Sequence, residues 1–156
     1  MLHDKHHFNV TTTWTGNRGT GTSSYRSYGR DHQVESAGKL HPIPASSSPA
    51  FRGDADRYNP EELLIAALSS CHMLWFLHLC ADAGIVVEEY RDEAGGTMEM
   101  NPDGSGQFAD VVLRPHVRLK DPSRAAETPA FHERAHHLCF IARSVNFPVR
   151  CDPASL

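Results

Sequence analysis

Four cysteines and eleven histidines are the side chains of this 156-residue sequence that could do the most chemistry. They could form disulfide staples, a metal site or a redox-active thiol pair. The cysteines stand at positions 71, 80, 139 and 151, and no two of them have CxxC spacing. Because CxxC spacing is absent, the sequence contains neither a zinc ribbon nor a thioredoxin motif. A chain of this length also needs no disulfide to hold its core together.

His132, Glu133 and His136 form a literal HExxH, in which two histidines bind zinc from one helical face and the glutamate is the general base. A catalytic zinc needs a third protein ligand. The extended motif would have a histidine where Ala142 stands, and no glutamate follows Glu133. The same helix would place Cys139 seven residues after His132. We therefore predict no bound metal, and a zinc hydrolase is only a minor alternative.

A long helix must position the first two cysteines. Asn59 can cap it, Pro60 suits its first position, Glu62 is placed for a capping box and Gly84 is a natural stop. The ordinary interpretation of a cysteine in mid-helix is that it packs in the core. A reactive thiol needs a lowered pKa, whereas burial alone raises it, so a cation from another part of the chain would be required. One stripe of this helix, about 100° wide, combines a carboxylate, a thiol and apolar side chains: Glu61, Leu64, Leu68, Cys71, Trp75 and His78.

The other elements are predicted from β-forming runs, turn residues and helix starts. A second helix is expected from Thr128 to about Arg143. The order of strands and helices predicts one α+β domain over residues 1–156, with two helices against antiparallel sheet. Strands are expected at 8–14, 23–28, 32–35, 85–90, 97–100, 108–119 and 145–149.

Composition and charge narrow the possible partners and compartment. Hydrophobic residues make up 40% and charged residues 22%, which is typical of a globular domain. A net charge of −4 without a basic stripe argues against nucleic-acid binding. Residues 63–81 carry no charge, but they include two serines and two histidines, so we expect a buried helix rather than a membrane span. The first residues lack a signal peptide's apolar core, which favours the cytoplasm.

Two segments taken together resemble a known family. Residues 59–64 with 66–73, and residues 136–145, are similar to the two cysteine segments of the OsmC/Ohr family, the osmotically inducible protein C-like and organic hydroperoxide resistance proteins. Shorter matches at 14–16, 51–54 and 95–98 follow in the expected order. The sequence resembles the general OsmC-like branch more closely than the strict hydroperoxide resistance branch.

The resemblance implies an α+β fold, an intertwined homodimer with active sites at the subunit interface, and a thiol peroxidase without a cofactor. Such an enzyme reduces organic hydroperoxides, and hydrogen peroxide less well. Cys71 corresponds to the peroxidatic cysteine and Cys139 to the resolving one, and an external dithiol, which can be a lipoylated protein, restores the pair. Glu61 corresponds to the acidic residue that holds a catalytic arginine. The apolar pocket would be lined by Leu64, Leu68 and Trp75.

The family places its catalytic arginine in one of two sequence patterns. The hydroperoxide resistance branch has it in a Gly-Arg-Asp turn, which residues 29–31 match, whereas the OsmC branch has it just before a phenylalanine, where Ala50 stands here. Arg30 is our choice, with Arg52, Arg18 and Arg57 in reserve. A binding or stress protein of the same fold, with little peroxidase activity, is the main alternative.

Overall fold

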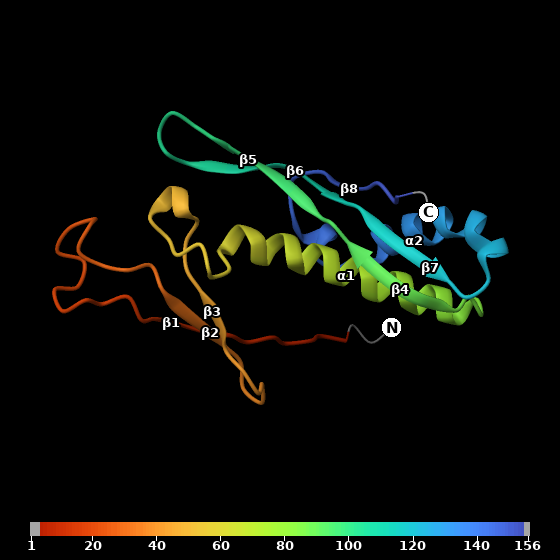
Figure 1. The fold of residues 1–156 in the computed structure, drawn as a ribbon, viewed down its shortest axis with the longest axis horizontal. Helices are drawn as coiled ribbons and strands as arrows, with labels where there is room; N and C mark the ends of the chain where they lie inside the picture. Colours follow the sequence, from red (N-terminus) through yellow and green to blue (C-terminus); the bar gives the residue numbers. More distant parts are fainter. Residues whose placement is uncertain (1–3, 155–156) are drawn as a thin grey trace. The chain divides into compact units, whose positions relative to one another are not determined.

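The computed structural model describes residues 4–154, and the chain divides into two compact units (Figure 1). We call residues 1–63 the N-terminal unit and residues 64–156 the C-terminal unit. The expectation of a single domain stays a prediction.

The N-terminal unit contains an antiparallel sheet in the order β1-β2-β3 (Figure 1). Its strands are β1 (Thr11–Trp14), β2 (His32–Glu35) and β3 (Ile43–Ala45), followed by the 3-10 helix η1 (Pro49–Phe51). Strand β3 was not predicted. The strand predicted at 23–28 is wrong, because this segment forms turns in which the Ser27 hydroxyl lies 2.8 Å from the carbonyl oxygen of Ser24.

Helix α1 (Pro60–Asp82) begins and ends where the sequence predicts. The backbone N–H of Glu62 donates to Asn59 Oδ1 at 2.8 Å, and the N–H of Asn59 donates to Glu62 Oε2 at 3.2 Å. This is the predicted capping box. At the other end Gly84 has φ 68°, and the Ile85 N–H donates to the Cys80 carbonyl at 2.8 Å. The left-handed glycine therefore closes the helix as a Schellman motif.

Asn59→Ala should lower the free energy of unfolding by about 1 kcal/mol, because the Glu62 N–H loses its acceptor. Urea unfolding followed by circular dichroism measures this loss. Glu62→Gln is the matched control, since its side-chain oxygen can still accept from the Asn59 N–H, and it should cost less. An Asn59→Ala variant as stable as the wild type would show that the capping box contributes nothing.

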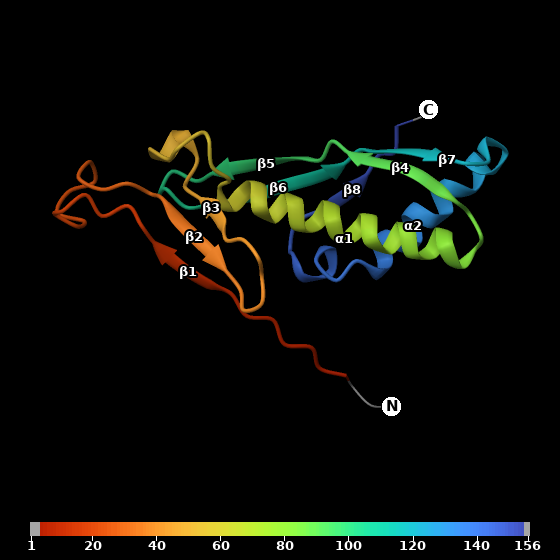
Figure 2. The ribbon, with the colours of Figure 1, turned by 60° about the horizontal axis from the view of Figure 1, so that its bottom comes forward.

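The strands of the C-terminal unit form two sheets that lie on one side of the helices (Figure 2). One pairs β4 (Val87–Asp92) with β7 (Pro115–Leu119), and the other has β5 (Gly95–Met100), β6 (Gly106–Leu113) and β8 (Val149–Cys151) in the order β5-β6-β8. The β6–β8 pair is parallel, so the prediction of purely antiparallel sheet is wrong at this point.

The single strand predicted at 108–119 is in fact two strands in different sheets. The break falls at Arg114, whose backbone N–H donates at 2.6 Å to a side-chain oxygen, Asp92 Oδ1, instead of to a backbone carbonyl. Pro115 follows, and a proline has no N–H to offer a ladder. The last strand also lies later than predicted, at Val149–Cys151 instead of 145–149.

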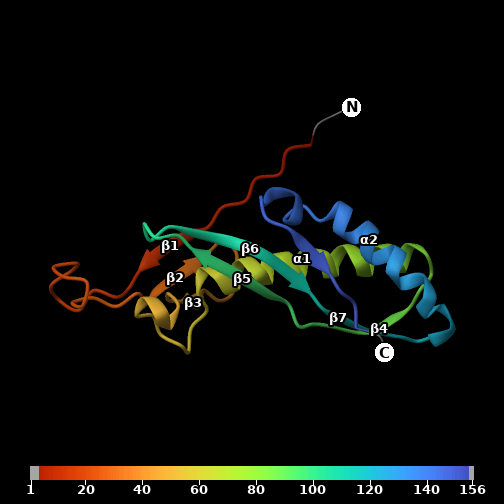
Figure 3. The same ribbon diagram turned by 90° about the horizontal axis from the view of Figure 1, so that it is seen from above.

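Helix α2 (Thr128–Leu138) lies alongside α1 (Figure 3) and is shorter than predicted. It follows the 3-10 helix η2 (Pro122–Glu127) and precedes η3 (Ala142–Ser144). Cys139 caps α2 in extended backbone, with ψ 107°, so the chain leaves the helix there and not at Arg143. The expected placement of Cys139 on the helix, in line with His132 and His136, is therefore wrong.

Two apolar clusters form the core of the C-terminal unit. The first joins Phe76 and Leu79 of α1 to strands β4 and β7 and to Ala135 of α2, and the second joins Leu68 to β6 and β8. By length and apolar composition α1 could also cross a membrane, a property that core helices share. Its buried residues form one stripe: Leu68, His72, Phe76, Leu79 and Cys80.

Candidate functional site

Cys71 and Cys139 interact in the C-terminal unit. Cys71 lies in the middle of α1 and is partly exposed, whereas Cys139 is buried at the end of α2, and both thiols are free. Burial raises the pKa of the Cys139 thiol to about 11, although a hydrogen bond from the Ala142 N–H opposes this, and the neighbouring Cys71 thiol raises it further. Cys139 is therefore a protonated thiol at neutral pH, held beside a second thiol.

A cavity of about 530 Å³ opens over Cys71. Trp75 and Phe140 meet there edge to face, with ring centroids 5.6 Å apart. A thiol at the wall of an apolar cavity can meet an apolar reactant. The cavity is lined by Ala67, Ser70, Cys71, Leu74, Trp75, His78, Phe140 and Ile141.

Only one of the three predicted pocket residues, Trp75, lines this cavity. Leu68 is fully buried in the second core cluster, and Leu64 packs against that cluster. Both leucines therefore contribute to the core beside the cavity.

Glu61 lies on the first turn of α1, ten residues before Cys71 in the sequence. Its Oε2 atom is buried and has no hydrogen-bond partner among the described residues. A buried carboxylate oxygen without a donor costs free energy, so such an atom indicates a missing cationic or N–H partner.

Arg30 is held by its own turn in the N-terminal unit. Its guanidinium donates to the carbonyl oxygens of Tyr28 at 2.7 Å and Tyr25 at 2.8 Å, and it lies over both tyrosine rings. Arg57 lies 3.6 Å from Asp54. In residues 4–154 the expected ion pair between Arg30 and Glu61 is not formed, and none of the reserve arginines pairs with Glu61.

The HExxH segment does not form a zinc site of its own. His132 is buried, and its ring stacks on Phe76 at 4.1 Å between centroids, whereas Glu133 and His136 are exposed. The buried residues of α2 are His132 and Ala135, so the motif's two histidines have different surroundings. In residues 4–154 the set His132, Glu133 and His136 is therefore not found as a group that could hold a metal, and nothing in the structure favours the zinc hydrolase alternative.

His132 instead belongs to a buried group with His72 and Cys151, which was not predicted from the sequence. His72 Nε2 lies 3.0 Å from His132 Nδ1 and 3.5 Å from Cys151 Sγ. Burial lowers the pKa of both histidines to about 4. A signal existed in the spacing of Leu68, His72, Phe76 and Cys80, four residues apart, which places His72 on a buried stripe.

Comparison with known proteins shows the family. Residues 53–153, which hold all four cysteines, match the family model described as OsmC-like protein. An OsmC-like protein of unknown function from Vibrio cholerae has a solved structure with a TM-score of 0.86 and 33% identity, covering 96% of this chain and 100% of that one.

Two Bacillus subtilis proteins are more distant. The organic hydroperoxide resistance protein OhrB has a TM-score of 0.63 and 19% identity, covering 94% of this chain and 98% of that one. The uncharacterized protein YmaD is 24% identical over 144 residues, 90% of this chain and 87% of its own length. The match of the fold to a solved OsmC-like structure and the match of residues 53–153 to the family model lead to the same conclusion. The chain belongs to the OsmC-like protein family.

Proposed function

We propose that the protein is a thiol peroxidase that reduces organic hydroperoxides, and hydrogen peroxide less well. One observation carries the proposal: the Cys71 thiol lies at the wall of an apolar cavity and interacts with the buried thiol of Cys139. Membership of a family that includes organic hydroperoxide resistance proteins supports it.

The reaction needs two thiols and no cofactor. The Cys71 thiolate attacks the outer peroxide oxygen, the O–O bond breaks, and the alkoxide leaves as an alcohol after taking up a proton. Cys71 becomes a sulfenic acid. Cys139 then attacks the Cys71 sulfur, a disulfide forms, and the hydroxyl leaves with the Cys139 proton as water. An external dithiol, of which a lipoylated protein is one source, reduces the disulfide and is itself oxidised.

The environments of the two thiols divide these roles. Cys139 is only 1% exposed and burial raises its pKa to about 11, so it cannot be the first nucleophile at neutral pH. Cys71 lines the cavity and is the thiol that a substrate can reach.

The cation that stabilises the Cys71 thiolate is assigned to an arginine held by Glu61. The buried, unpartnered Glu61 Oε2 is the acceptor that such a guanidinium needs. We propose Arg30 for this role, after its release from the carbonyl oxygens of Tyr25 and Tyr28.

The working unit that we propose is a cytoplasmic homodimer. Two apolar side chains at the cavity, Leu74 and Phe140, are 63% and 67% exposed. Exposed apolar groups at the mouth of a site are typical of an interface. A second copy of the chain would cover them and complete the walls of the cavity.

The proposal is tested by turnover of an alkyl hydroperoxide with dihydrolipoamide as reductant. We expect catalytic alcohol formation, the loss of two thiols per chain when the reductant is left out, and a sulfenic acid on Cys71 in the Cys139→Ser variant. Absence of turnover in protein whose thiols are all reduced would instead favour a binding protein of the same fold.

Trp75→Ala should lower kcat/KM for a bulky hydroperoxide such as cumene hydroperoxide by about tenfold or more, because the cavity loses its largest apolar wall. Hydrogen peroxide is the internal control, since it is too small to fill the cavity and should lose little. Equal losses for both peroxides would contradict a role of Trp75 in substrate selection.

A further inference from the structure

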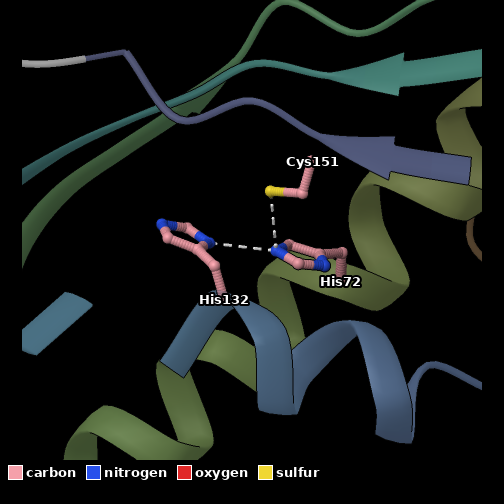
Figure 4. A group of neighbouring side chains, drawn as sticks. All are labelled: His72, His132 and Cys151. Atoms are coloured by element: carbon pink, nitrogen blue, oxygen red, sulfur yellow. Dashed lines mark hydrogen bonds between the residues drawn. The ribbon is translucent and has the colours of Figure 1, made fainter. Parts of the chain in front are cut away.

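A second group of chemically capable side chains lies in the interior of the C-terminal unit. His72 comes from α1, His132 from α2 and Cys151 from strand β8, and the three side chains converge on one point (Figure 4). Their ligand atoms, two imidazole nitrogens and one sulfur, all lie within 4.8 Å of one another. The peroxidase chemistry proposed for Cys71 and Cys139 uses none of them.

The donor set fits zinc. Two imidazole nitrogens and a thiolate are borderline and soft ligands, which favour Zn²⁺ over Mg²⁺ or Ca²⁺. Zinc with bonds of 2.0–2.3 Å would require tetrahedral edges of about 3.3 Å between two nitrogens and about 3.6 Å between nitrogen and sulfur. His72 Nε2 lies 3.0 Å from His132 Nδ1 and 3.5 Å from Cys151 Sγ, and the third separation, between His132 and Cys151, lies within 4.8 Å. Zinc binding therefore requires shifts of these side chains, including a small movement of the two histidines apart.

The hydrogen bonds of this neighbourhood are incomplete. His72 Nδ1 and the Tyr90 hydroxyl are both buried without a partner among residues 4–154. Tyr90 lies close enough to Cys151 for that thiol to contribute to the rise of the tyrosine's pKa, after burial and Asp92. Buried polar atoms left unpaired cost free energy, so this neighbourhood is not an ordinary apolar core.

A cavity reaches one member of this group. His132 lines a cavity of about 680 Å³ whose walls include Pro153 and Ala154, the residues that follow shortly after Cys151. Three protein ligands would leave a fourth position for water or a small molecule, the arrangement of a catalytic zinc.

We propose that His72, His132 and Cys151 bind one Zn²⁺ ion per chain, through Nε2, Nδ1 and Sγ respectively. Binding requires the thiolate, so each zinc ion taken up displaces one proton from Cys151 into solvent, and affinity falls as the pH is lowered. This site uses only the first histidine of the HExxH segment. It is separate from the peroxidase proposal, which stands or falls on Cys71 and Cys139.

The test is zinc uptake by the full, reduced, metal-free chain, measured by competition with a chromophoric chelator and by elemental analysis after gel filtration. We expect one zinc ion per chain and a melting temperature that rises with zinc concentration. Cys151→Ser, in which the changed group is small and partly exposed, should weaken binding on the order of 100-fold or more, as should His132→Ala.

The matched controls are His136→Ala and His137→Ala, which remove exposed histidines from the same helix and should bind zinc as the wild type does. Cobalt(II) gives a second readout: its thiolate charge-transfer band should appear in the wild type and in both controls and disappear in Cys151→Ser. A wild type that takes up no zinc, a Cys151→Ser variant with unchanged affinity and unchanged cobalt spectrum, or a His136→Ala variant that loses binding would each overturn the proposal.

Discussion

Cys71→Ser is expected to abolish hydroperoxide turnover, with a loss in kcat/KM on the order of 10³-fold or more. The nucleophile of covalent catalysis has no substitute, because a serine hydroxyl at neutral pH neither ionises nor attacks a peroxide as a thiolate does. The Cys139 thiol cannot take over, since it is buried and its pKa is raised to about 11. Consumption of tert-butyl hydroperoxide with dihydrolipoamide measures the effect.

Two other cysteine variants show whether the loss is specific. Cys80→Ser changes a thiol on the same helix that is 1% exposed, packs in the first core cluster and has a pKa raised to about 11 by burial. It should keep its peroxidase activity, apart from any loss of stability. Cys139→Ser should complete the first turnover and then depend on the external thiol to reduce the sulfenic acid. Full activity in Cys71→Ser would overturn the proposed function.

Local signals in the sequence were sufficient for the long helix. Asn59 and Glu62 form a capping box from atoms three residues apart, and Gly84 closes the helix within five residues. Interactions of such short range depend little on the rest of the fold, so a linear sequence reveals them.

The buried face of α1 was harder to predict. The segment from Leu63 to Ala81 carries no charged side chain, and its few polar residues do not mark one polar face, so periodicity cannot show which face is buried. The predicted stripe ran through Cys71 and Trp75, which line the cavity, whereas the buried stripe runs through His72 and Phe76, one residue or about 100° further round. The two stripes differ in function because α2 and the strands cover only one of them.

The group of His72, His132 and Cys151 depends on pairings between distant segments. His72 and His132 are sixty residues apart, and Cys151 reaches them only because β8 pairs in parallel with β6. No spacing rule links such positions. The HExxH segment drew attention to His132 for its distance from His136, whereas the structure sets it against a histidine of another helix.

Acid should destabilise the metal-free protein through this histidine pair. Burial lowers the pKa of His72 and of His132 from the ordinary 6.5 to about 4. Asp92 opposes the effect at His72 and His136 adds to it, while His72 adds to the effect at His132. Above pH 6.5 both rings are neutral in the folded and unfolded chains, so the stability is at its full value. Between pH 6.5 and 4 the unfolded chain takes up protons that the folded chain does not, and the free energy of unfolding falls as the pH falls.

The expected loss is about 2 kcal/mol per histidine between pH 6.5 and pH 5, since each pH unit in this window contributes about 1.4 kcal/mol. Urea unfolding in the presence of a chelator, at pH 7 and at pH 5, measures it. His132→Asn removes one titrating ring but keeps a polar atom near the position of Nδ1, so the difference between the two pH values should shrink by about 2 kcal/mol. His137→Ala, which changes an exposed ring, should leave the difference unchanged. An equal acid sensitivity in His132→Asn would contradict the assignment of the effect to this histidine pair.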